Sequence, residues 1–253
     1  MRIVIKVGTS TLAYPTGHVN LRRISRLCRV LSDFKNAGHE VILVSSGAIG
    51  MGVGKLGLDG RPEDIQGKQA AAAVGQCELM YTYDKEFSEY HHTVAQILIT
   101  GGEVEQPEHF RNFKNTMERL LQWNVLPIVN ENDTVSVTEL MFTDNDELSG
   151  LIAQMMDADT LILLSNIDGI YNGHPDDPQS EIIRCVAPGT DLSQYIKVEK
   201  SAFGRGGMHS KYTTASKVSQ AGIRVIIANG ERENILIDLM EHKDETPHTE
   251  FEV

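Results

Sequence analysis

The sequence predicts an α/β protein built around a mainly parallel sheet. Short apolar runs alternate with segments of helical periodicity along the 253 residues. The apolar runs are continuous, which is typical of parallel strands that are covered by helices on both faces. We therefore expect a three-layer αβα sandwich.

The predicted elements follow one another along the chain. A strand over 2–7 precedes a helix whose apolar residues keep a spacing of three or four from Leu21 to Phe34 and which ends at Ala37-Gly38. Further strands are expected at 41–44, 93–99, 125–129, 160–164 and 223–228. Further helices are expected at 62–90, 107–123, 144–156 and 208–220.

The composition fits a soluble domain with a substantial core. Apolar residues make up 41%, and the net charge is 23 − 35 = −12, which disfavours general binding to nucleic acid or to an anionic membrane. No apolar stretch approaches the roughly 18–20 residues of a membrane span, and the first residues are too polar for a signal peptide. Three widely separated cysteines favour the cytoplasm. The nine histidines follow no metal-binding spacing and are expected to be surface or core histidines, and the sequence leaves the metal ligands unassigned.

No linker divides the chain. We expect a single domain over residues 1–240, followed by an acidic tail over 241–253 that has little apolar content and should be frayed.

Polar and glycine residues gather where the predicted strands end, at 6–10, 45–47, 130–134 and 165–169. In open α/β sheets, ligands bind beyond the carboxyl ends of the strands. This clustering predicts a site for a small molecule.

Two glycine motifs do not carry a prediction. The segment 52–57 has GxGxxG spacing, but it begins several residues after a strand and runs into 58–62, which is no helix start. A dinucleotide-binding loop needs a tight strand–turn–helix. The Gly-Lys pairs at Lys55 and Lys68 lack the other positions of a P-loop.

Lys6 lies in an otherwise apolar strand, two residues before Gly8. It could be an edge-strand lysine that extends its ammonium to water. Alternatively, Lys6 and the backbone amides after it hold phosphate oxygens.

Ser46 follows the second strand in the segment Ser45-Ser46-Gly47, where small residues allow the backbone to approach a ligand. An ordinary N-cap serine is the alternative.

Two clusters of amides and carboxylates follow the fourth strand. Asp133 suits the recognition of an ammonium group, while Asn130 and Asn145 can bond a carboxylate or a backbone group. Asp146 would direct a fixed negative charge toward cations in the site. Helix capping alone would account for Asp144.

The segment 204–211 places glycines before a helix and Lys211 in the first turn of that helix. The helix dipole disfavours a cation there, so this lysine indicates a bound phosphate. A flexible surface loop with a chance lysine is the alternative. Two lysines, paired acids and amide-rich turns, without a nucleophile–base pair, favour phosphoryl transfer with Mg²⁺ bridging the nucleotide phosphates.

In this order, the motifs resemble the amino acid kinase family, and within it the branch that phosphorylates L-glutamate. The matching segments are 6–10, 45–49, 130–133, 144–146 and 206–211. The resemblance implies transfer of the ATP γ-phosphate to the side-chain carboxylate of L-glutamate, giving glutamyl 5-phosphate in the first step of proline biosynthesis.

The resemblance also implies roles for individual residues. Lys6 and Lys211 would stabilise the transferring phosphoryl group, and Asp146 would orient both lysines. The expected glutamate-binding residues are Ser46, Asp133, Asn145 and Asn130. The expected ATP-binding residues are Lys6, Gly8, Ser165, Asn166, Arg205, Gly206, Gly207, Met208, His209, Ser210 and Lys211.

The chain departs from many relatives at three places. Ser165-Asn166 replaces a threonine–aspartate pair, which should alter ATP affinity, and Arg205 adds a cation where threonine is common. The resemblance is to a form of the family that we expect to lack the C-terminal PUA domain of many relatives. The resemblance further implies feedback inhibition by proline and a homodimer or homotetramer.

Two alternatives stay open at this point. The first is a sibling kinase that acts on aspartate, acetylglutamate, carbamate, UMP or isopentenyl phosphate. The second is a non-catalytic amino-acid sensor with the same fold, which would not need both Lys6 and Lys211 together with Asp146.

Overall fold

The structure is a computed structural model that describes residues 1–14, 18–104, 106–136, 144–196 and 207–253. The chain divides into two compact units. The first unit comprises Met1–Val7 and Thr143–Val253, and the second unit comprises Gly8–Phe142.

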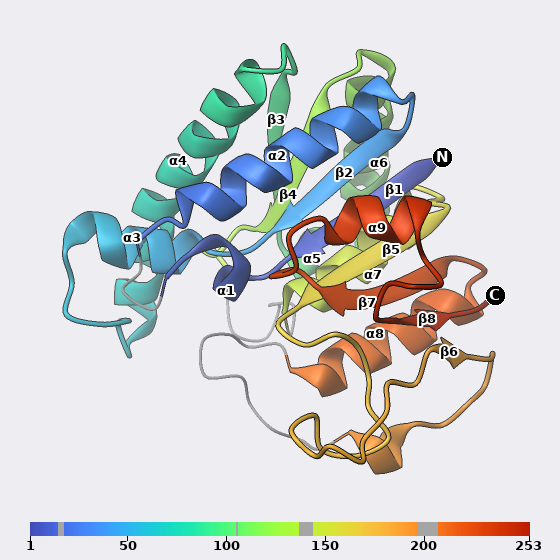
Figure 1. The fold of residues 1–253 in the computed structure, drawn as a ribbon. Coiled ribbons are helices and arrows are strands. Elements are labelled where there is room, and N and C mark those ends of the chain that lie inside the picture. The colour runs from blue at the N-terminus through green and yellow to red at the C-terminus, as the bar shows by residue number, and fades with distance from the viewer. Residues whose placement is uncertain (15–17, 105, 137–143, 197–206) are drawn as a thin grey trace. The chain divides into compact units, whose positions relative to one another are not determined.

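The first unit contains five neighbouring strands in the order β1-β5-β7-β8-β6. Their bounds are β1 (Arg2–Val7), β5 (Thr160–Ser165), β6 (Cys185–Val186), β7 (Arg224–Asn229) and β8 (His248–Phe251). All the pairings are parallel except that of β7 with β8. The helical elements are α7 (Asn145–Met155), the short 3₁₀ helix η2 (Ser193–Tyr195), α8 (Met208–Gln220) and α9 (Ile235–Glu241), and α9 lies nearest the viewer (Figure 1).

The second unit contains three parallel strands in the order β3-β4-β2. Their bounds are β2 (Glu40–Ser45), β3 (Val94–Ile99) and β4 (Leu126–Glu131). The helices are α1 (Thr9–Leu12), α2 (Leu21–Asn36), α3 (Ala48–Leu56), α4 (Ile65–Ser88), α5 (Gly101–Val104) and α6 (Pro107–Gln122). Figure 1 shows α2 and α6 on opposite faces of these strands.

The predicted class, α/β with a mainly parallel sheet between helices, is confirmed. Every strand and helix that the periodicity predicts is present, with ends that differ by at most three residues. The reason is visible in the burial, because strands such as β4 and β5 are buried at every position and therefore need the continuous apolar runs from which they were predicted. The single-domain description of residues 1–240 stays a prediction.

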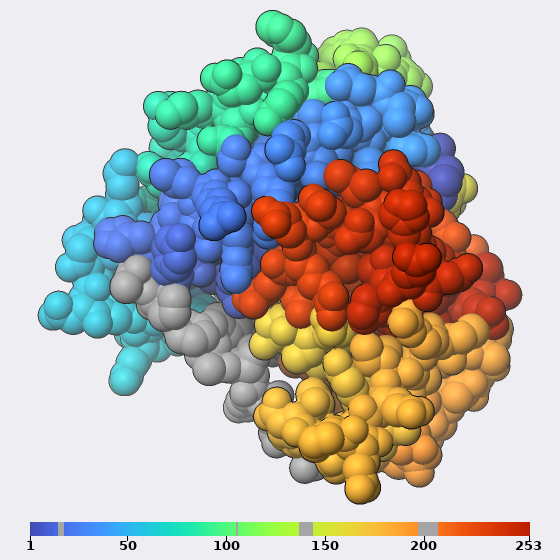
Figure 2. All heavy atoms as spheres, viewed as in Figure 1, coloured from blue at the N-terminus to red at the C-terminus, as the bar shows by residue number. Residues whose placement is uncertain are grey.

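The expectation of a frayed tail is wrong for residues 248–251. They form β8, which pairs antiparallel with β7 and parallel with β6. Phe251 is buried, and the Thr249 hydroxyl accepts a hydrogen bond from the Ile170 amide. On the face shown in Figure 2, the red C-terminal residues lie directly against the yellow-to-orange segment before residue 196. Backbone pairing, rather than an apolar run, orders this acidic segment.

The GxGxxG segment at 52–57 lies largely within a helix, α3, and is not a phosphate-binding loop. A Cβ atom on Gly52 would lie 1.8 Å from the carbonyl oxygen of Ala71, and one on Gly75 would lie 1.7 Å from that of Ala48. These two glycines therefore allow the backbones of α3 and α4 to touch. None of the described helices combines the length and apolar character that a membrane crossing requires.

Candidate active site

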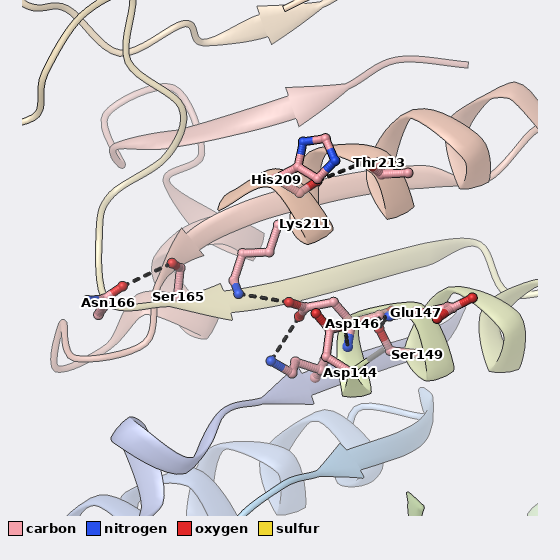
Figure 3. Close-up of polar contacts among 10 residues, drawn as sticks. Asp144, Asp146, Glu147, Ser149, Ser165, Asn166, His209, Lys211 and Thr213 are labelled. Atoms are coloured by element: carbon pink, nitrogen blue, oxygen red, sulfur yellow. Dashed lines mark hydrogen bonds and ion pairs between the residues drawn. The ribbon is translucent and has the colours of Figure 1, made fainter. Parts of the chain in front are cut away.

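A buried carboxylate lies between two ammonium groups in the first unit (Figure 3). Lys6 Nζ is 2.8 Å from Asp146 Oδ1, and Lys211 Nζ is 2.9 Å from Asp146 Oδ2. Asp146 is fully buried, and the two lysines are 6% and 7% exposed. The structure thus brings together the three residues that the sequence singled out as catalytic.

Each of the three residues is placed by a different element. Lys6 is the penultimate residue of β1, where its neighbour in the parallel pairing is Leu163 of β5. Asp146 lies in the first turn of α7, and Lys211 lies in the first turn of α8. The edge-strand alternative for Lys6 and the surface-loop alternative for Lys211 are therefore wrong, since both side chains are buried against Asp146.

The start of α7 holds Asp146 in place. Asp144 Oδ1 accepts hydrogen bonds from the backbone amides of Asp146 and Glu147, at 2.8 and 3.1 Å. The Ser149 hydroxyl donates to the Asp146 carbonyl oxygen at 2.7 Å. The capping role for Asp144 is thus confirmed, and it fixes the backbone from which the Asp146 side chain extends.

Burial and charge oppose each other at this cluster. Burial alone would raise the pKa of the Asp146 carboxyl, but the ammonium groups of Lys6 and Lys211 outweigh it and hold that pKa below its ordinary value. Burial lowers the pKa of Lys6, attraction to Asp146 opposes this change, and repulsion from Lys211 adds to it. Asp146 is accordingly a fixed anion and not a proton acceptor near neutral pH.

The Asp146 carboxylate bridges both ammonium groups, and the buried Asp144 carboxylate adds a weaker attraction on Lys6. Charge interactions are strong in a site that is shielded from water. Two ammonium groups held on one carboxylate suit a group whose negative charge moves during a reaction, as in phosphoryl transfer.

The predicted nucleotide-binding residues of the first unit lie at two strand and helix ends. Ser165 ends β5, and its hydroxyl donates to Asn166 Oδ1 at 3.5 Å, with the Asn166 side chain exposed (Figure 3). Gly207 precedes α8, and its carbonyl oxygen accepts from the Lys211 amide at 3.2 Å.

The other nucleotide-binding candidates are described only in part. Met208 and Ser210 are half-buried in the first turn of α8, and His209 is exposed. Figure 3 shows the side chains of His209 and Lys211 on opposite sides of this turn. Arg205 and Gly206 lie outside the described residues.

An ion pair that the sequence reasoning missed follows Ser165-Asn166. The Arg232 guanidinium donates to both carboxylate oxygens of Asp168, at 2.7 and 2.6 Å, and Asn229 donates to Asp168 Oδ1 at 3.0 Å. The hydrogen bonds from Arg232 lower the pKa of Asp168. These contacts connect the segment after β5 to the end of β7.

Three of the four predicted acceptor-binding residues belong to the second unit, and the fourth, Asn145, is the first residue of α7. Ser46 follows β2 and precedes Gly47, which has φ of +107° and is the N-cap residue of α3. The N-cap alternative for Ser46 is wrong, because the N-cap position is occupied by Gly47, which has no side chain to accept a capping bond. Asp133 lies half-buried in the turn after β4.

Asn130 is held at both ends of its amide. It is 2% exposed at the end of β4, its Nδ2 donates to Gln76 Oε1 at 3.0 Å, and its Oδ1 accepts from the Glu131 amide at 2.9 Å. Gly8, the remaining candidate, precedes α1 and accepts from the Thr11 amide at 3.1 Å.

The fold and the lysine–aspartate–lysine cluster define a phosphotransferase of the αβα class. Residues 1–229 match the model of the amino acid kinase family, and the chain belongs to this family.

Curated relatives that are similar in sequence are named as one enzyme of this family, glutamate 5-kinase. The glutamate 5-kinase of Bacteroides thetaiotaomicron is 49% identical over 250 residues, which cover 99% of this chain and 69% of the relative. The glutamate 5-kinase of Clostridium perfringens is 48% identical, covering 96% of this chain and 93% of the relative. The glutamate 5-kinase of Enterococcus faecalis is 47% identical, covering 96% of this chain and 92% of the relative.

Solved structures agree on the fold. An isopentenyl phosphate kinase of T. acidophilum, solved as a product complex, aligns with a TM-score of 0.68 at 15% identity, over 99% of this chain and 100% of that one. A carbamate kinase from Giardia lamblia bound to AMP-PNP also gives a TM-score of 0.68 at 15% identity, over 99% and 97%. The expected amino acid kinase fold is confirmed.

Proposed function

We propose that this chain transfers the γ-phosphoryl group of ATP to the side-chain carboxylate of L-glutamate, giving L-glutamyl 5-phosphate as the first step of proline biosynthesis. The observation that carries the proposal is the buried cluster of Lys6, Asp146 and Lys211, in which one carboxylate holds two ammonium groups. Relatives named glutamate 5-kinase, identical at nearly half of the aligned positions, support L-glutamate as the acceptor.

The chemistry needs no general base. The γ-carboxylate of glutamate is already ionised at neutral pH, because its ordinary pKa is about 4.3. One of its oxygens forms a bond to the γ-phosphorus, the bond from that phosphorus to the bridging oxygen breaks, and ADP leaves with the electron pair. Lys6 and Lys211 stabilise the negative charge on the moving phosphoryl group, and Asp146 keeps both ammonium groups directed to one point.

ATP would bring Mg²⁺ with it. Mg²⁺ usually takes one or two carboxylates together with phosphate oxygens and water. Asp144 offers such an oxygen, because its Oδ2 is buried and has no hydrogen-bond partner among the residues that the structure describes. The ion would neutralise charge on the nucleotide phosphates when it is bound.

The substrate contacts follow from the chemistry of the side chains. Asp133 would pair with the α-ammonium group of glutamate, while Ser46, Asn130 and Asn145 would donate hydrogen bonds to its carboxylates. Ser165, Asn166, Gly8 and the segment 205–211 would bind ATP. Inhibition by proline, assembly into a dimer or tetramer and a cytoplasmic location rest on the family resemblance.

The test is a comparison of acceptors. ADP release is measured by a coupled assay with L-glutamate, L-aspartate, acetylglutamate, carbamate, UMP and isopentenyl phosphate, and the acyl phosphate is trapped as a hydroxamate with hydroxylamine. Turnover and hydroxamate formation are expected with L-glutamate. Turnover only with another acceptor would assign that substrate instead, and binding of glutamate without any turnover would favour the sensor.

A further inference from the structure

Three polar side chains on α4 lie on one face of the helix. Gln69, Gln76 and Tyr83 are spaced seven residues apart, which places each one about two helical turns from the next. Gln76 and Tyr83 are buried. We call these three residues the α4 polar stripe.

Each member of the α4 polar stripe bonds a segment at the end of a strand. Gln69 Nε2 donates to the Ser136 carbonyl oxygen at 3.4 Å, in the turn that follows β4. Gln76 Oε1 accepts from Asn130 at the end of β4. The Tyr83 hydroxyl lies 2.9 Å from Ser45 Oγ at the end of β2.

These targets surround the predicted acceptor residues of the second unit. Ser45 precedes Ser46, and its hydroxyl donates to the Ser46 carbonyl oxygen at 3.2 Å. Ser136 also donates to Glu131, at 2.8 Å, which closes the turn that contains Asp133. The α4 polar stripe therefore holds the two turns that carry these residues.

The helix cannot easily shift while it makes these bonds. Gly75, next to Gln76, touches the start of α3, since a Cβ atom at Gly75 would lie 1.7 Å from the Ala48 carbonyl oxygen and 2.4 Å from the Gly52 nitrogen. Close backbone contact of this kind leaves no space for adjustment. Gln76 is thus fixed relative to the turn between β2 and α3.

Gln76 differs from the other two members in having an unused donor. It is 8% exposed, and its Nε2 is buried without a hydrogen-bond partner among the described residues. Its Oε1 is engaged by Asn130, so the amide cannot simply flip to satisfy that nitrogen. A buried donor without an acceptor lowers stability, and a fold keeps one where function requires it.

We propose that Gln76 is a positioning residue for the acceptor amino acid. It fixes the orientation of the Asn130 amide, and its own N–H adds a partial positive charge beside Asn130, where a carboxylate of the acceptor would be favoured. Gln76 thereby sets the KM for L-glutamate without taking part in phosphoryl transfer. This inference rests on the proposed function and extends it to one residue.

The test compares the unaltered chain with Gln76→Met and Gln76→Glu. Methionine keeps the length of the side chain and removes both hydrogen-bonding atoms, whereas glutamate keeps the acceptor for Asn130 and replaces the donor with a carboxylate oxygen. The same two substitutions at Gln122, an exposed residue in the last turn of α6, provide the matched controls. Steady-state kinetics for both substrates and thermal unfolding are measured on every variant.

Gln76→Met is expected to raise the KM for L-glutamate by about 10- to 100-fold, with kcat and the KM for ATP changed by less than about threefold. Its melting temperature should fall by no more than a few degrees, because the loss of the Asn130–Gln76 hydrogen bond is partly offset by removal of the unsatisfied Gln76 donor. Gln76→Glu should raise the KM for L-glutamate at least as much. The Gln122 variants should leave kcat, both KM values and the melting temperature unchanged.

Several outcomes would overturn the inference. An unchanged KM for L-glutamate in a folded Gln76→Met variant removes Gln76 from acceptor binding. A parallel loss of kcat, of ATP binding and of melting temperature, or failure of both variants to fold, assigns Gln76 a structural role only. Failure of the proposed function is seen separately, since the unaltered chain would then not turn over L-glutamate.

Discussion

Replacing Asp146 with asparagine should destabilise the first unit, and the loss should shrink as the pH rises. Asparagine keeps the shape of the side chain, but one of its two polar ends becomes an N–H donor that faces an ammonium group. Lys6 and Lys211 then remain as two buried cations without the carboxylate that bridges them.

The size of the loss follows from the cost of discharging one lysine. Removing a proton at pH 7 from a lysine with an ordinary pKa of about 10.4 costs about (10.4 − 7) × 1.36, or about 4.6 kcal/mol. This value is an upper limit, because burial already lowers the pKa of Lys6. It agrees with the range of about 3–5 kcal/mol for breaking a buried ion pair by removal of one partner.

The sign of the pH dependence is fixed by proton binding. In Asp146→Asn, the folded state binds fewer protons than the unfolded state, in which the lysine keeps its ordinary pKa. Stability of the variant therefore rises with pH, by up to about 1.4 kcal/mol per unit, until the pH reaches the unfolded pKa. At pH 9 the same calculation gives an upper limit of about 1.9 kcal/mol for the loss of stability in Asp146→Asn.

The assay is urea denaturation of the unaltered chain and of Asp146→Asn at pH 7, 8 and 9. Glu147→Gln, which removes an exposed carboxylate from the next position of α7, is the control and should cost less than about 1 kcal/mol at every pH. A loss in Asp146→Asn that stays equal from pH 7 to pH 9, or that stays below about 1 kcal/mol at pH 7, would refute the reasoning.

Three further predictions concern separate parts of the chain. Lys211→Met should lower kcat by about 10²- to 10³-fold with little loss of stability, because Asp146 keeps its ion pair with Lys6. Lys217→Met, on the exposed side of the same helix, is the control and should leave kcat unchanged. An unaffected kcat in Lys211→Met would remove Lys211 from the mechanism. Gly75→Ala should lower the free energy of unfolding by about 3 kcal/mol in urea denaturation, since its Cβ would lie 1.7 Å from the α3 backbone, and a neutral effect would contradict the close contact. Asp168→Asn weakens the partner of Arg232 and should raise the KM for ATP about two- to fivefold without changing that for L-glutamate; equal changes in both would argue against a role on the nucleotide side.

Much of the fold could be predicted because buried parallel strands require continuous apolar runs. The same principle explains the failure at residues 248–251, where β8 is held by backbone bonds to β7 and β6 and carries two polar residues that are buried. Helix α3 is rich in glycine and is not among the helices that the periodicity predicts. Its glycines are needed for contact with α4, a requirement that depends on the partner helix and is absent from local sequence.

The candidate active site was predictable where a residue conflicts with its local setting. Lys6 interrupts an apolar strand, and Lys211 occupies a helix start that disfavours cations, so each indicated a function before any contact was known. Gln76 conflicts with nothing in its helix, and its partner Asn130 lies 54 residues away. Only the seven-residue spacing of the α4 polar stripe offered a signal, and apolar periodicity does not detect it.

The most direct test of the proposed chemistry is a crystal structure with L-glutamate, ADP, Mg²⁺ and aluminium fluoride, which mimics the transferring phosphoryl group. We predict that Lys6 Nζ and Lys211 Nζ both donate to the fluoride ligands while Asp146 still bridges the two ammonium groups, with the γ-carboxylate of glutamate and the β-phosphate of ADP on opposite sides of the aluminium. A phosphoryl mimic bound away from either lysine, or a glutamate that presents its α-carboxylate instead, would contradict the account.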